Sequence, residues 1–172
     1  MITLAINTGA RISELLALTY NDIKTDRIVI NKQVSEKPKF KDGKTAGHEL
    51  VIDTTKSENS VISIPITEET YALLEAHKKW HEAEMRKNYY KTDYVFTTET
   101  GNLYDKCSLR HTLDRIHEYV GVPQYGFHAY RHTFGTRLAS KGVALQTLSS
   151  LKGTAIYLQQ PNTTSTCLLP KR

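Results

Sequence analysis

The segment of residues 127–134, which reads FHAYRHTF, constrains the fold of this chain more than any other stretch. It places His128 and Arg131 three residues apart, so one turn of a helix aims both side chains at the same point. Such a helix needs an anionic partner, and a phosphodiester is the obvious candidate. We therefore predict a helix over residues 128–140, closed by Gly142, with one face turned to a phosphate.

A second arginine lies far upstream, in the segment TGARISEL at residues 8–15. Arg11 in this segment precedes apolar residues with helical spacing up to residue 19. A guanidinium suits phosphate because its planar fork binds two oxygens and keeps its charge. The two groups form one clamp only if the fold brings Arg11 and Arg131 together.

Length and composition describe an ordinary globular domain. The chain has 172 residues, 39% of them hydrophobic and 24% charged, which is enough for one domain with a core. Its net charge of +5 is modestly basic, as expected of a protein that meets nucleic acid. Cys107 and Cys167 have no metal-like spacing and indicate a reducing compartment. The sequence has no apolar run long enough to span a membrane and no recognisable signal peptide. We therefore expect a cytoplasmic protein with no membrane partner.

Three short runs have strand character: residues 27–31, 49–53 and 61–66. The polar residues 37–47 between the first two predict a mobile loop. Helices are predicted from Thr67 to about Lys87, over residues 108–119, and from residue 143 onward. The predicted fold class is therefore α+β and mainly helical, with a small three-stranded antiparallel sheet.

The two arginine segments together resemble the catalytic domain of the tyrosine recombinases, the phage-integrase family. The resemblance covers residues 1–151 and implies that double-stranded DNA is cut and rejoined through a 3′-phosphotyrosine, without metal or other cofactor. It implies that Arg11 and Arg131 clamp the phosphate and that His128 handles a proton. The family carries a lysine between its second and third strands, so Lys56 takes the general-acid role, for which neighbouring cations lower a lysine pKa.

Residues 152–172 depart from the family pattern. Thr154 stands where the family has a second histidine, and Thr163 stands where it has the nucleophilic tyrosine. One inserted G in codon 153 of a back-translated tail permits GHSDISTTAKYYINVS, which restores both groups. We therefore interpret residues 152–172 as an aberrant tail, either frameshifted or disordered, and expect this chain alone not to cleave DNA. Supply of the tyrosine by a neighbouring protomer, in a homo-oligomer on DNA, stays open.

The apolar turn at the very start of the chain, residues 1–6, indicates an N-terminally truncated catalytic domain. Because the family's separate DNA-binding domain is then missing, we expect weaker affinity for DNA. An alternative function is a non-enzymatic DNA-binding remnant of an integrase that uses the same basic cleft. A metal-dependent nuclease is a third class, but Asp22, Asp26 and Asp53 lack the spacing of a metal site.

Several other polar residues have ordinary structural interpretations. His128 and His132 have metal-site spacing, yet Arg131 between them would repel a cation. His77 and His81 lie in a heavily charged stretch that reads as a solvated helix face. Lysines within residues 37–44 either follow a DNA backbone or belong to a solvated loop. The tyrosines are expected to cover the edge of the core: Tyr89, Tyr90 and Tyr94.

Overall fold

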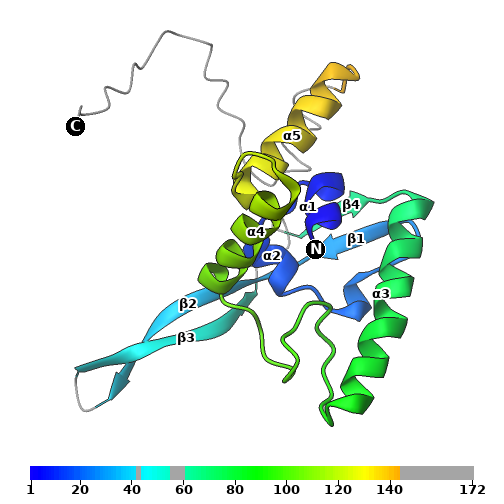
Figure 1. Ribbon diagram of the computed structural model, residues 1–172. Helices are drawn as coiled ribbons and strands as arrows, with labels where there is room; N and C mark the ends of the chain where they lie inside the picture. Colours follow the sequence, from blue (N-terminus) through cyan, green and yellow to red (C-terminus); the bar gives the residue numbers. More distant parts are fainter. Residues whose placement is uncertain (42–43, 55–60, 144–172) are drawn as a thin grey trace, which may run out of the picture.

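The computed structural model describes residues 1–41, 44–54 and 61–143, and the statements below concern these residues (Figure 1). The elements follow in the order α1 (Ile2–Thr8), α2 (Ile12–Leu16), the 3-10 turn η1 (Tyr20–Asp22), β1 (Arg27–Ile30), β2 (Lys32–Lys41), β3 (Lys44–Thr54), β4 (Ile62–Pro65), α3 (Glu68–Lys87), α4 (Lys106–Val120) and α5 (Phe127–Ser140). The predicted α+β, mainly helical fold class is confirmed.

Helices α1, α3 and α4 begin or end at local sequence signals, whereas α2, expected to continue to Thr19, ends at Leu16. Gly9 closes α1 in the left-handed conformation, with φ of 63°. Thr67 caps α3 by accepting a hydrogen bond from the backbone N–H of Thr70. Asp105 caps α4 in the same way, and Gly121 ends that helix with φ of 74°. These signals are short-range, so the elements that carry the candidate site could be located without knowledge of the tertiary fold.

The strands form two antiparallel pairs in place of the expected three-stranded sheet. Strand β1 pairs with β4, with Ile28 opposite Ile64, and β2 pairs with β3, with Val34 opposite Ile52. The β2–β3 hairpin extends away from the rest of the molecule (Figure 1). It occupies most of residues 37–47, where the sequence predicted a loop. Both faces of its outer part meet solvent, so no apolar alternation marks it as a strand pair.

The main core lies between α1, α2, the β1–β4 sheet and α3. Its buried residues are mostly aliphatic: Leu4, Ala5, Ala10, Leu15, Leu18, Ile28, Ile30, Ile64, Leu74, Val95 and Phe96. A smaller cluster of Leu16, Ala17 and Val34 attaches the base of the β2–β3 hairpin to α2. Because α1 and α2 are buried in this core, the turn between them, which carries Arg11, has a rigid support.

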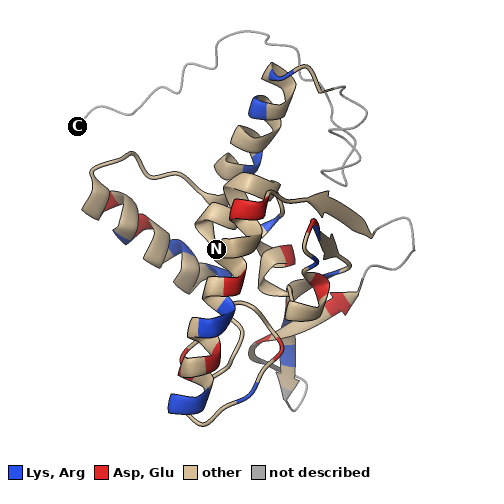
Figure 2. Cartoon of the chain, turned by 90° about the vertical axis from the view of Figure 1, so that its right-hand side faces the viewer, with Lys and Arg blue, Asp and Glu red and all other residues tan. Residues whose placement is uncertain are grey.

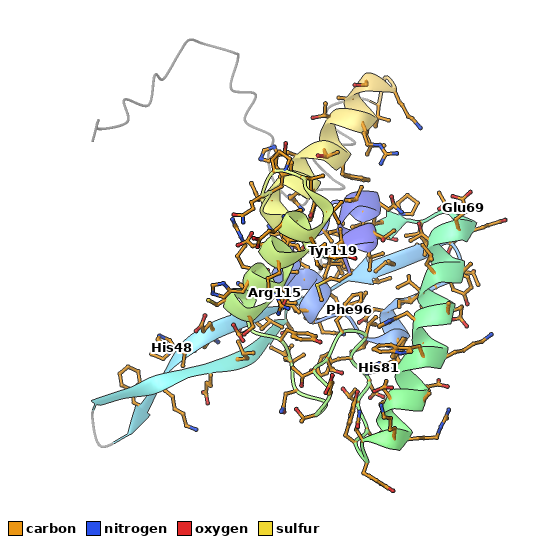
Figure 3. The ribbon with its side chains drawn as sticks, viewed as in Figure 1. His48, Glu69, His81, Phe96, Arg115 and Tyr119 are labelled. Atoms are coloured by element: carbon orange, nitrogen blue, oxygen red, sulfur yellow. The ribbon has the colours of Figure 1, made fainter. Side chains whose placement is uncertain are left out.

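Two expectations about polar residues are wrong. His81 is buried, with 3% of its surface exposed, and hydrogen-bonds the Tyr20 hydroxyl through Nδ1 and the Thr97 hydroxyl through Nε2. The labelled His81 in Figure 3 accordingly lies on the inner side of α3. Tyr89 is 96% exposed and does not cover the core, whereas Tyr90 is partly buried. No helix among the described residues is long and apolar enough to cross a membrane.

Candidate phosphate-binding site

Helix α5 lies against α1, and one buried arginine joins the two. Arg131 is 7% exposed, and its Nη1 donates a 2.6 Å hydrogen bond to the carbonyl of Gly9. The two residues are 122 positions apart in the chain. Gly9 also packs against α5, because a Cβ at this position would lie 2.4 Å from Cδ1 of Phe134. The contact therefore brings the FHAYRHTF helix against the turn that holds Arg11.

Arg11 is oriented by a buried carboxylate on its own helix. It is the N-cap of α2, and Nη1 of its side chain donates to Oε1 of Glu14 at 2.6 Å. The backbone N–H of Arg11 donates to Oε2 of the same carboxylate at 2.7 Å. Glu14 is only 7% exposed, while the side chain of Arg11 is 39% exposed. Glu14 therefore holds the guanidinium from the protein side, and part of the Arg11 side chain is exposed to solvent.

The positive charge of Arg11 lies close enough to act on the guanidinium of Arg131. Burial lowers the pKa of Arg131, and the positive charge of Arg11 lowers it further, while Glu14 acts in the opposite direction. The net direction is downward, so the surroundings of the Arg131 cation are unfavourable on balance. An anion bound between the two guanidinium groups would offset this repulsion. The structure thus places Arg11 and Arg131 at one locality, as a shared phosphate clamp requires.

His128 lies at the same end of α5, one turn before Arg131, and is exposed. Its ring meets that of His132 edge-on, with centroids 4.7 Å apart and an interplanar angle of 81°. Helix α5 contains no Asp or Glu, and Figure 2 shows only basic charges along it. An anion approaching the start of α5 therefore meets an accessible imidazole and no acidic side chain of that helix.

Several predicted features lie outside the described residues. Lys56 is one of them, as are Thr154, Thr163 and the helix predicted from residue 143 onward. Within the described ranges, no group of three or more His, Cys, Asp or Glu side chains is arranged to hold a metal ion. Three of the four predicted site residues, Arg11, His128 and Arg131, are therefore placed by the structure.

The sequence interpretation missed the residues that hold the arginines. Glu14 follows Arg11 by three positions, a spacing typical of a capping box, and this signal was available. The role of the Gly9 carbonyl had no local signal, because its partner is 122 residues away. Both groups fix a guanidinium before any ligand arrives.

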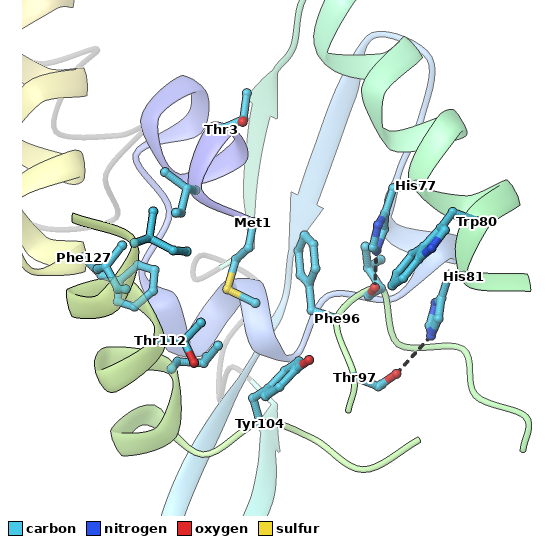
Figure 4. Close-up of a pocket in the computed structure, with 15 residues that line it drawn as sticks. Met1, Thr3, His77, Trp80, His81, Phe96, Thr97, Tyr104, Thr112 and Phe127 are labelled. Carbon is cyan, nitrogen blue, oxygen red and sulfur yellow. Dashed lines mark hydrogen bonds between the residues drawn. The ribbon is translucent and has the colours of Figure 1, made fainter. Parts of the chain in front are cut away.

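A hollow of about 410 Å³ lies elsewhere, between the start of α1, helix α3 and helix α4 (Figure 4). Its walls are mainly apolar and include Trp80, Phe96, Tyr104 and Leu113. His77 closes one side, where its Nε2 hydrogen-bonds the carbonyl of Val95 at 2.8 Å. None of the three described site residues lines this hollow, so the arginine site is a separate surface feature.

Comparison with known proteins connects this geometry to one family. The model of the phage integrase family matches residues 1–155. The chain is 32% identical over 161 residues to a "Tyrosine recombinase XerC-like" protein of Caldanaerobacter subterraneus subsp. tengcongensis, covering 89% of this chain and 41% of that protein. It is 29% identical over 122 residues to the ICEBs1 integrase of Bacillus subtilis, covering 70% of this chain and 26% of the integrase. The chain thus spans less than half the length of these curated relatives.

Solved structures show the same fold. The Tn1549 transposon integrase in complex with circular intermediate DNA matches with a TM-score of 0.70 and 26% identity, over 88% of this chain and 50% of that one. The XerA recombinase matches with a TM-score of 0.64 at 17% identity, over 88% of this chain and 45% of that one. The second match is a likeness of fold alone.

Proposed function

The chain belongs to the phage integrase family, and from this premise we propose that residues 1–151 act as the DNA-contacting catalytic domain of a site-specific recombinase. The recombinase would serve a phage or another mobile element. One observation carries the proposal: Arg131 is buried against the Gly9 carbonyl beside Arg11, whose side chain is 39% exposed. The proposed partner is double-stranded DNA, which the related Tn1549 integrase holds in its complex, and the proposed location is the cytoplasm.

The proposed roles of the residues combine the family resemblance with the surroundings of Arg11, His128 and Arg131. The guanidinium groups of Arg11 and Arg131 would bind the nonbridging oxygens of one phosphate and stabilise the charge that builds on them in the transition state. Glu14 and the Gly9 carbonyl hold these groups in advance, so little reorganisation is needed when DNA binds. His128 is exposed one helical turn before Arg131 and would donate a proton to the bound phosphate or accept one from it. Lys56 would protonate the leaving 5′-oxygen.

Cleavage requires a nucleophile in addition to this clamp. In the intact family a tyrosine attacks phosphorus, and Thr163 occupies that place in this chain. A secondary hydroxyl has no phenolic acidity, and loss of a covalent nucleophile typically lowers turnover by several orders of magnitude. We therefore propose that the chain binds DNA without forming a phosphotyrosine link by itself. The non-enzymatic remnant is the second candidate. It is favoured because residues 152–172 contain no histidine and their one tyrosine, Tyr157, lies three residues past Thr154 instead of nine.

DNA binding tests the clamp directly. Fluorescence anisotropy with a labelled duplex would be measured over a salt series, with wild type, Arg11→Ala and Arg27→Ala. Arg27 is exposed and pairs with its neighbour Asp26, so its removal controls for net charge. We expect Arg11→Ala to weaken binding about tenfold or more, as loss of a charged hydrogen bond would. The slope of log K against log salt should also fall by about one contact. Equal losses in the two variants would refute the clamp.

A nicked suicide substrate tests the missing nucleophile. The expected result is a duplex complex on a native gel and no covalent protein–DNA adduct on a denaturing gel. An adduct formed by this chain alone would overturn the cleavage-deficient assignment. An adduct formed only after addition of a relative that keeps its tyrosine but lacks its own phosphate-binding arginines would instead indicate a tyrosine supplied in trans within a mixed oligomer. Size analysis of this chain alone on a duplex with two half-sites tests the proposed homo-oligomer.

A further inference from the structure

Helix α5 carries the proposed clamp, yet few of its side chains are buried. Among its 14 residues only Arg131 and Gly135 are buried within the described part of the molecule. Four apolar residues on one face of α5 are only partly buried: Phe127, Tyr130, Phe134 and Leu138. Phe134 packs against Gly9 and Tyr130 against the main core, and polar contacts beside this face further set the directions of His128 and Arg131. One such contact is the Arg131 hydrogen bond to the Gly9 carbonyl.

A second polar contact holds α5 from the side of α4. Nε2 of His117 and the hydroxyl of Tyr130 share a hydrogen bond of 3.0 Å. His117 is only 6% exposed, and its Nδ1 is buried without a hydrogen-bond partner among the described residues. The Tyr130 hydroxyl is thus the one hydrogen-bond partner this imidazole has in the described part of the chain. A buried polar ring with one contact depends strongly on that contact, because leaving the group unsatisfied costs stability.

The two contacts act on different sides of α5. Tyr130 and Arg131 are consecutive, so their side chains leave the helix about 100° apart. Tyr130 packs against the main core, where burial raises its pKa, and its ring meets Phe127 edge-on at 6.1 Å. Arg131 reaches α1 in another direction. Together with the packing of Phe134 against Gly9, two hydrogen bonds separated by this angle fix the rotation of the helix.

We propose that His117 is a positioning residue: through the Tyr130 hydroxyl it fixes the rotation of α5 and so directs His128 and Arg131 at the phosphate. This inference rests on the proposed function, because the directions of His128 and Arg131 on α5 matter only if an anion binds at the arginine site. It assigns a role to α4 residues that lie outside the two arginine motifs. His117 touches neither the phosphate nor the reacting atoms in this proposal and acts only through Tyr130.

Tyr130→Phe is the variant that isolates this contact, because it removes the hydroxyl and keeps the ring. Tyr125→Phe is the matched control. Tyr125 meets the same imidazole edge-on, with centroids 6.2 Å apart, and removal of its hydroxyl leaves the His117–Tyr130 bond in place. Both variants are measured in the full chain, with thermal melting as the check on folding.

The first readout needs no DNA. The Nε–Hε resonance of the Arg131 side chain reports the surroundings of its guanidinium in a ¹⁵N spectrum. We expect Tyr130→Phe to shift or broaden this resonance and Tyr125→Phe to leave it unchanged. An unchanged resonance in Tyr130→Phe, even with a lowered melting temperature, would show that the bond is merely structural and would overturn the proposal.

The second readout is duplex binding over a salt series. Tyr130→Phe should weaken binding about three- to tenfold, which is the effect of one hydrogen bond on an equilibrium. The salt slope should also fall, because a misdirected arginine loses its phosphate contact. Wild-type affinity and slope in Tyr130→Phe would overturn the positioning role. If wild type binds no duplex while the Arg131 resonance responds to Tyr130→Phe, the helix link stands and the proposed function fails.

Discussion

Replacement of Gly9 by alanine should destabilise the fold and disturb the candidate site together. Gly9 has φ of 63°, and a left-handed conformation costs an L-residue about 1–2 kcal/mol. The new Cβ would also lie 2.4 Å from Cδ1 and 2.9 Å from Cγ of Phe134, so the ring or helix α5 must move. Overpacking of this kind costs about 1–3 kcal/mol. The expected loss in free energy of unfolding is therefore about 2–5 kcal/mol.

Gly121→Ala is the matched control for this prediction. Gly121 ends α4 with φ of 74°, but a Cβ there would meet no atom within 4 Å. Its replacement should cost only the backbone contribution, about 1–2 kcal/mol. Urea unfolding of both variants separates the two contributions, since the excess loss in Gly9→Ala measures the contact with Phe134. Equal losses in the two variants would refute the argument that Gly9 is required for close approach of α5.

A double-mutant cycle strengthens the test. Phe134→Ala removes the ring that the new Cβ would strike, so Gly9→Ala should cost less in that background than in wild type. The Gly9 carbonyl also accepts the hydrogen bond of Arg131. A displaced α5 should therefore weaken duplex binding by Gly9→Ala even under conditions where the variant is fully folded. Additive losses of stability in the cycle would contradict the steric explanation.

Three further outcomes follow from the structure. Glu14→Gln removes the carboxylate that holds Arg11. It should therefore lower the free energy of unfolding by about 1–3 kcal/mol, measured by urea unfolding, and weaken duplex binding, measured by anisotropy. Burial and then the nearby His77 charge lower the pKa of His81 from 6.5, so the unfolded chain takes up a proton at higher pH than the folded one. The urea midpoint should thus decline as pH falls below 6.5, and less so in His81→Gln. Sulfate should raise the melting temperature of wild type more than that of Arg11→Ala, since only wild type retains both guanidinium groups.

The sequence predicted the helices well because their boundaries depend on single residues. Thr67 begins α3, Gly121 ends α4, and neither signal requires a distant partner. Residues 49–53 were correctly predicted as a strand and lie within β3, but β2 and the outer part of the hairpin were missed for the opposite reason. Its outer part has no buried face, so neither periodicity nor composition distinguishes it from a polar loop. Only the pairing of Val34 with Ile52 at its base carries an apolar signal.

The prediction that His81 lies on a solvated face was wrong for a different reason. It was made because the stretch around His81 is rich in charged residues. Yet Thr70, Leu74, His77 and His81 follow one another at helical spacing along a single face of α3. Three of them are buried, and His77 hydrogen-bonds the Val95 carbonyl. The position within the helical repeat was therefore a better guide to burial than the local density of charge.

In the candidate site, too, local signals could be found in the sequence and contacts between distant residues could not. The types of Arg11, His128 and Arg131 and their motifs were visible in the sequence, and so was the requirement that the two arginines meet. The means by which they meet was not visible, because the Gly9 carbonyl and the Tyr130 hydroxyl reach partners on other elements. Contacts of this kind depend on the final orientation of α5 against α1 and α4. No propensity or spacing within one segment encodes them.

The arrangement around Arg131 is explained better by binding than by stability. Burying a guanidinium is unfavourable unless its surroundings compensate, and here burial and the charge of Arg11 outweigh the influence of Glu14 on its pKa. An apolar residue at this position would join α5 to α1 without that penalty. A bound phosphate would offset the cost of burying the Arg131 guanidinium beside Arg11, because two cations already held in place would bind it with little reorganisation. The local destabilisation of the unbound protein and the proposed affinity for DNA would thus be two consequences of the same pair of arginines.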